Sequence, residues 1–171
     1  MFHRLPSVVV LSTFLLIHLP GAAVGGRPAL GGSSSTSTGS AIERIALNDN
    51  QHAAGSLADG LLTVHLEARV GEWRPDGDGA PGVDVKAFSV EDGALQIPGP
   101  LIRVKEGTRV RVFVRNRVAG EPLAVHGLYS RPAATPAEPV IIPAGETREL
   151  TFSAGSPGTY YYWPPPILRR R

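Results

Sequence analysis

A strictly alternating segment, RVRVFVR at residues 109–115, most constrains what this chain can fold into. Its three valines share one face, and its three arginines and Phe113 share the other. A period of two beside a glycine turn, here Glu106-Gly107, is typical of a half-buried antiparallel strand. We predict that the valines face a hydrophobic core. Residues 98–128, from a Pro-Gly-Pro corner to His126-Gly127-Leu128, then form the centre of the domain.

Several other segments show the same alternation, separated by turns rich in glycine and proline. The clearest, residues 61–69, follows an Asp59-Gly60 turn signal, and we expect its even-numbered residues to face the core. The outward face is expected to hold Thr63, His65, Glu67 and Arg69. Further strands are expected at residues 83–90, 101–104, 140–142, 147–152 and 159–163, and no segment has a convincing helical pattern. The sequence therefore predicts an all-β fold, a Greek-key sandwich or barrel.

The absence of cysteine excludes several kinds of site. It rules out disulfides, thiolate metal ligands, a cysteine nucleophile and a mononuclear blue-copper centre, whose strongest ligand is a thiolate. The formal net charge of +2 is smaller than the charge of the C-terminal run Arg169–Arg171, so the remainder of the chain is close to neutral. Nucleic-acid partners need clustered basic residues interleaved with aromatic side chains, and the scattered arginines here predict no such partner.

The N-terminal residues have the character of a secretory signal. Residues 1–23 begin with a weakly positive start, continue as an apolar run from Ser7 to Leu19, and end in small residues. The run is too short to cross a bilayer as a helix, and an uncleaved anchor is the alternative. We expect a secreted or periplasmic protein with no membrane span after removal of the signal.

Composition divides the rest of the chain into three parts. Residues 24–47 begin with a run of Gly, Ser and Thr and are expected to form a flexible linker, since such a segment buries little apolar surface. Residues 48–163 carry the predicted strands and form the domain. Residues 164–171 are a tail that starts with three prolines and ends with three arginines.

Three segments, in this order and spacing, resemble the first cupredoxin (plastocyanin-like) domain of multicopper oxidases. They are GPLIRVKEG at residues 99–107, His126-Gly127-Leu128, and IPAGE at residues 142–146 leading to Gly158-Thr159-Tyr160. The resemblance covers roughly residues 60–163. It implies a cupredoxin-like Greek-key fold, copper as the cofactor, and oxidation of a substrate coupled to reduction of oxygen when the other domains are present.

The resemblance also implies which residues would hold copper. Family members supply two His-x-His pairs from this domain, and a strand's period of two points both imidazoles of a pair to the same side. Here the first pair is Ala124-Val125-His126 and the second falls on Trp163-Pro164-Pro165. Alanine, tryptophan and proline offer no ligand for copper, so His126 is the one candidate metal ligand. We expect copper binding to be weak or absent.

The family pattern continues beyond residue 163 into another strand. Three consecutive prolines at residues 164–166 cannot donate ladder hydrogen bonds, so no central strand is expected to run through them. We expect the domain to lack its last strand and to leave a sheet edge open. Another cupredoxin domain or an oxidase chain in trans is the partner that could fill it.

Three functions follow from these observations. The first is a secreted cupredoxin-like module that is not an active oxidase alone, with His126 in a structural role. The second is a copper-binding subunit of a multicopper oxidase, in which His126 ligates copper at an interface with a partner chain. The third is a carbohydrate or ligand binder that uses Trp73, Trp163 and the tyrosines at 160–162. No catalytic residue is predicted, since the sequence has no GxSxG, HExxH or phosphate-binding glycine motif.

Overall fold

A computed structural model describes residues 42–133, 135, 137–165 and 169–170. Those residues form ten strands and no helix, which confirms the all-β prediction. The predicted signal peptide, and the linker up to residue 41, lie outside the described residues. No helix in the described part is long and apolar enough to cross a bilayer.

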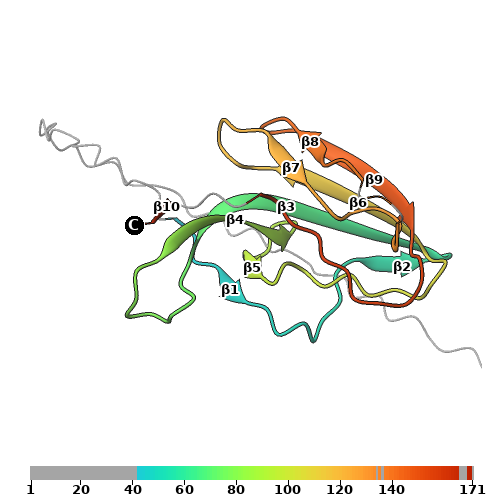
Figure 1. The fold of residues 1–171 in the computed structure, drawn as a ribbon, viewed down its shortest axis with the longest axis horizontal. Coiled ribbons are helices and arrows are strands. Elements are labelled where there is room, and N and C mark those ends of the chain that lie inside the picture. The colour runs from blue at the N-terminus through green and yellow to red at the C-terminus, as the bar shows by residue number, and fades with distance from the viewer. Residues whose placement is uncertain (1–41, 134, 136, 166–168, 171) are drawn as a thin grey trace, which may run out of the picture. The chain divides into compact units, whose positions relative to one another are not determined.

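The strands form one large sheet and one small one (Figure 1). The large sheet has the order β1-β5-β4-β3-β6-β9, with β2 paired to β3 and β10 paired to β4, and the small sheet pairs β7 with β8. The bounds of the large sheet are β1 (Ala46–Leu47), β2 (Ser56–Ala58), β3 (Leu61–Trp73), β4 (Val83–Val90), β5 (Gln96–Ile97), β6 (Arg109–Asn116), β9 (Thr147–Ser153) and β10 (Arg169–Arg170). The small sheet contains β7 (Leu123–Val125) and β8 (Val140–Ile142).

β3 and β6 bury the apolar faces that the sequence predicts. In β6 the three valines are fully buried, and in β3 the even-numbered residues Leu62 to Ala68 are buried with them. The two strands pair in parallel from Leu61↔Arg109 to His65↔Phe113, so their apolar faces are continuous. Between β2 and β3, Asp59 and Gly60 both have positive φ, which fits the turn predicted there.

The small sheet covers this apolar face as a second layer. Leu123 and Val125 of β7 and Ile142 of β8 are buried in the same core cluster as the β3 and β6 residues. A two-layer arrangement of sheets around one core is a β-sandwich. The core therefore lies between the large sheet and the segment that carries His126.

The predicted outward position of Glu67 is wrong. Its side chain is 1% exposed because the second face of β3 is also covered there. Ile45 and Leu95 form a second, smaller core cluster on Ala87 of β4. The covering segment begins before Asn48, the predicted start of the domain, since β1 and the buried Ile45 precede it.

The strand predicted at residues 101–104 does not form. Leu101 makes one isolated parallel bridge to Ala53, and no strand is assigned to residues 102–104. Arg169 and Arg170 pair antiparallel with Asp84 and Val83 at one end of β4.

Candidate functional site

His126 follows directly after β7 and forms a backbone bridge to Trp163. The amide of His126 donates to the carbonyl of Trp163 at 3.0 Å, and the amide of Trp163 donates back to the carbonyl of His126 at 3.2 Å. This exchange of both hydrogen bonds defines a hydrogen-bonded antiparallel pair, whose side chains lie on the same face. The structure therefore brings together two residues from the two segments that the family resemblance implicates in copper binding.

The remaining two implied ligand positions lie two residues away along each segment. Ala124 lies on the same side of its segment as His126, because side chains alternate along a strand, and it pairs with Ile141 of β8. Pro165 follows Trp163 by two residues, and no bridge joins it to another segment in the described ranges. Leu123 and Val125 are buried, whereas Ala124 and His126 are half-buried, so this face points away from the core. Ala124, His126 and Trp163 thus share one outward face, and of the four implied positions His126 alone can ligate copper.

The side chains of His126 and Trp163 are stacked. Their ring centroids lie 5.2 Å apart and the ring planes are 5° from parallel. The indole has only an N–H donor and provides no lone pair for a metal. Trp163 therefore occupies the face of the imidazole without adding a ligand.

Gly127 allows the two segments to come this close. Its φ is +83°, a conformation that favours glycine. A Cβ atom at Gly127 would lie 2.1 Å from the carbonyl oxygen of Tyr161, too near for any other residue without a shift of the backbone. The His-Gly sequence thus fixes both the direction of the chain after His126 and the position of the Tyr161–Trp163 segment.

Tyr162 anchors that segment to the sandwich. Its hydroxyl donates a hydrogen bond of 2.6 Å to the carbonyl of Pro100, and its ring packs on Phe88 with centroids 5.2 Å apart. Burial raises the pKa of Tyr162, because a phenolate is poorly solvated in this position. The anchor holds the neighbouring Trp163 in place over His126.

The other two described histidines do not extend the site. His65 stacks on Phe113 at 4.8 Å and lies 3.5 Å from the Glu91 carboxylate, while His52 is exposed in the segment before β2. Within the described ranges, no three His, Cys, Asp or Glu side chains gather as a metal site would require. The residues present do not fit the copper cluster that the family resemblance implies.

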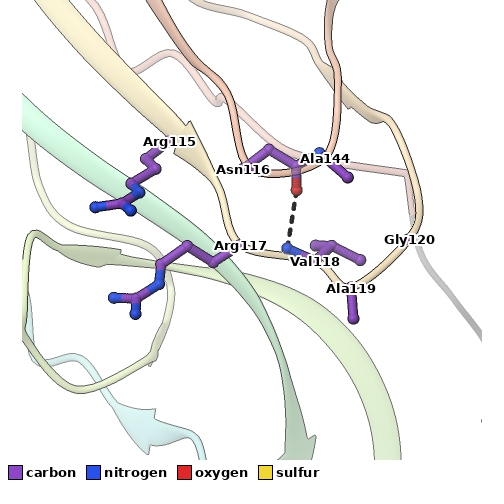
Figure 2. Close-up of a pocket in the computed structure, with 8 residues that line it drawn as sticks. Arg115, Asn116, Arg117, Val118, Ala119, Gly120 and Ala144 are labelled. Atoms are coloured by element: carbon purple, nitrogen blue, oxygen red, sulfur yellow. Dashed lines mark hydrogen bonds between the residues drawn. The ribbon is translucent and has the colours of Figure 1, made fainter.

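A shallow pocket lies at the end of β6. It is lined by residues 115–120, Ala144 and Gly145. Figure 2 shows Arg115 and Arg117 extending on one side of it, and the amide of Val118 donating to the Asn116 side chain at 2.9 Å. Its lining holds no imidazole or carboxylate, so it offers no copper ligands.

The aromatic residues of the predicted ligand-binding surface do not gather in one place. Trp73 packs against the second core cluster beside Ile45 and Leu95, and Tyr162 packs against the main core. Tyr160, Tyr161 and Trp163 remain exposed. The three exposed rings belong to the segment that also carries the His126 partner.

Two buried polar residues were missed by sequence reasoning. Asn116 is fully buried, and its amide donates to the carbonyls of Glu121 and Ile142. Asn116 lies two residues after the last of the three buried valines of β6. Extending the same alternation to residue 116 would have predicted its burial. Glu67 accepts from Arg69 at 2.7 Å and from Arg117 at 3.1 Å, and no local signal in the sequence indicates its burial.

Comparison with known proteins points in one direction. A family model described as multicopper oxidase matches residues 83–171. A probable nitrite reductase-hydroxylamine oxidoreductase fusion protein from Kuenenia stuttgartiensis is 29% identical over an alignment that covers 61% of this chain and 13% of that protein. The chain thus spans a small part of the length of that relative.

Solved structures of similar proteins include two bacterial oxidases. A multicopper oxidase from Campylobacter jejuni, described as a metallo-oxidase, has a TM-score of 0.48 and 21% identity, covering 72% of this chain and 26% of that one. The McoA multicopper oxidase from Aquifex aeolicus has a TM-score of 0.44 and 19% identity, covering 73% of this chain and 25% of that one. The match is confined to about a quarter of each of these proteins.

Proposed function

The chain belongs to the multicopper oxidase family, and we propose that it is a secreted cupredoxin-like module that does not act as an oxidase by itself. Membership of the family confirms the resemblance found in the sequence. The all-β sandwich described above is the cupredoxin-like domain of this family. The proposal concerns what this domain does when its implied copper ligands are so few.

The pairing of His126 with Trp163 carries this proposal. A copper cluster needs several imidazoles held together, because its affinity depends on ligands that are preorganised on one scaffold. At the three positions where the family resemblance implies the other imidazoles, this sequence has Ala124, Trp163 and Pro165. One imidazole on an outward face is a weak, monodentate ligand. His126 serves in this reading as a structural residue that pairs two segments.

Export supports the proposal from a different part of the chain. An apolar run followed by small residues at the N-terminus is typical of a secretory signal, and a chain without cysteine has no thiol to protect outside the cytoplasm. N-terminal sequencing of the protein from its native host tests this point. A mature chain that starts near residue 24 supports export, and a chain that retains its apolar run contradicts it.

Copper stoichiometry tests the loss of redox function most directly. The purified full chain is loaded with copper, dialysed, and analysed by metal mass spectrometry, paramagnetic resonance and oxygen uptake with a phenolic substrate. We expect copper well below one ion per chain and no oxygen uptake. A coupled copper cluster in the isolated chain, or turnover of the phenol, overturns the proposal.

A second candidate function is that of a subunit completed by another chain. The outward face beside His126 is apolar, since Ile141, which pairs with Ala124, is 52% exposed and Trp163 is 47% exposed. An exposed apolar patch of this kind is typical of a protein interface. Stoichiometric copper that appears only when an oxidase domain from the same host is added, and disappears in His126→Ala, favours this function over the first.

A further inference from the structure

A cleft separate from the pocket at the end of β6 lies beside the Pro98–Glu106 segment. It has a volume of about 840 Å³ and is lined mainly by residues 98–106 and 152–162. Several lining residues, namely Ile102, Val104, Phe152 and Tyr162, also pack against the main core. The cleft therefore has an apolar floor that is continuous with the interior.

Two lengths of unpaired backbone border this cleft. Ala54 donates to the carbonyl of Leu101, and no backbone group of residues 102–104 pairs with another backbone group in the described ranges. The backbone groups of residues 160–162 likewise pair with no other backbone group in the described ranges. The next residue, Trp163, pairs with His126. Unpaired extended backbone is the feature that recruits an added strand.

The first of these segments has the alternation of a strand without a partner. Ile102 and Val104 are half-buried against the core, whereas Arg103 and Lys105 are exposed. A strand added beside this segment would place alternate residues on the apolar floor and the others next to the two cations. The geometry thus selects for apolar residues at every second position of an occupant.

The charged residues around the cleft favour acidic side chains at the remaining positions of a bound strand. Its charged lining residues are Arg103, Lys105 and Arg131 against the single carboxylate of Glu106. The Arg131 guanidinium lies 4.8 Å from the ring centroid of Tyr160 and 5.5 Å from that of Tyr129. Its Nε–H group is buried without a hydrogen-bond partner in the described residues.

We propose that this cleft binds an extended peptide segment in which apolar residues alternate with acidic ones. The segment adds as a strand along residues 102–104, with its apolar side chains on Ile102 and Val104 and its carboxylates beside Arg103 and Lys105. This binding activity goes beyond the proposed function and depends on no copper site.

Binding of designed peptides to the full chain tests the proposal. The probe is a capped peptide of alternating valine and glutamate, about seven residues long, which matches a typical strand. The controls are the same peptide with lysine in place of glutamate, and the glutamate peptide with alternate amide nitrogens methylated. We expect the glutamate peptide to bind at least about tenfold more tightly than either control, and more weakly as salt rises.

Two double variants, one in the cleft and one control outside it, test whether charge determines the preference. Arg103→Glu with Lys105→Glu changes only exposed side chains, and we expect it to prefer the lysine peptide. Arg109→Glu with Arg115→Glu, which reverses two exposed arginines of β6 that do not line the cleft, is expected to keep the preference for glutamate. Hydrogen exchange is expected to slow at residues 102–104 when the glutamate peptide is added.

Three results overturn the proposal. The first is equal binding of the glutamate and lysine peptides to the unmodified chain. The second is equal binding of the methylated peptide, which would show that no strand is added. The third is displacement of the glutamate peptide by a neutral oligosaccharide such as maltohexaose, which would identify the cleft as a carbohydrate site instead.

Discussion

The imidazole of His126 and the indole of Trp163 lie face to face, with centroids 5.2 Å apart, on two segments joined by reciprocal backbone hydrogen bonds. The pair differs from two facing metal-binding imidazoles in one side chain, the indole of Trp163. The backbone that would hold two facing imidazoles is present, and an indole occupies one of the two places. Restoring imidazoles to this backbone is therefore the most direct experiment on the chain.

We predict that Ala124→His combined with Trp163→His creates a copper site. The two new imidazoles share the outward face with His126, so the variant offers three ligands where the unmodified chain offers one. The expected result is retention of about one copper ion per chain after dialysis, measured by metal mass spectrometry. The matched control, Leu47→His with Leu57→His, adds two imidazoles at exposed positions of β1 and β2 and should retain no more copper than the unmodified chain. Equal retention by the two double variants would contradict the assigned register.

We predict that Gly127→Ala destabilises the protein more than Gly107→Ala. Both glycines have φ near +80°, so the backbone strain of adding a Cβ is similar, about 1 kcal/mol in each case. The added Cβ meets nothing within 4 Å at Gly107, whereas at Gly127 it would lie 2.1 Å from the carbonyl oxygen of Tyr161. The difference in unfolding free energy is expected to reach about 2 kcal/mol in urea titrations, with altered fluorescence of Trp163. Similar losses at both positions would show that the Tyr161 segment moves aside without penalty.

We predict that Glu67→Gln lowers the unfolding free energy by about 2–4 kcal/mol, because it leaves Arg69 and Arg117 without their buried carboxylate. The control is Glu149→Gln, since Glu149 pairs with Arg111 on an exposed part of the sheet. Exposed pairs contribute at most about 1 kcal/mol, so this variant should differ little from the unmodified chain. Urea denaturation monitored by circular dichroism measures both. An equal, small effect at both positions would mean that the Glu67 cluster is well solvated.

We predict that Tyr162 makes the protein less stable as the solution becomes alkaline. Burial raises the pKa of Tyr162 above the usual tyrosine value of 10.0. The unfolded chain therefore loses this proton first as pH rises, so the unfolding free energy is full below pH 10.0 and falls above it. Tyr162→Phe should show a shallower decline in this alkaline range, although it loses about 1 kcal/mol at neutral pH with the hydrogen bond to Pro100. Tyr161→Phe, at a ring that is 73% exposed, should follow the unmodified chain.

Local patterns predicted much of the fold. The valines of β6 and the apolar residues of β3 lie on the predicted face because side chains alternate along any strand, whatever its partners are. The prediction of a strand at residues 101–104 was wrong because strand formation does depend on a partner. Its alternation is genuine, but a strand also needs a neighbour, and the described chain places none beside residues 102–104.

The candidate site was predicted in part. The sequence singled out His126 and the residues aligned with the other implied ligands, but it could not indicate that Trp163 stacks on the imidazole. The burial of Glu67 was also out of reach, since it depends on Arg117, 50 residues away in sequence, and on the segment around Ile45 that covers β3. Such contacts are set by long-range packing and leave no periodic signal.

The sequence by itself determined the alternation of β3 and β6, the apolar face that each of them buries, the lack of cysteine and the supply of one imidazole where the family resemblance implies four. Those properties follow from the period of the backbone and from the chemistry of each side chain, and neither requires a partner. Only the tertiary structure decided the register that joins His126 to Trp163, the burial of Glu67 and the cleft beside residues 102–104. Each of these arises where segments distant in sequence exchange hydrogen bonds or fail to do so, and that outcome depends on the packing of the whole domain.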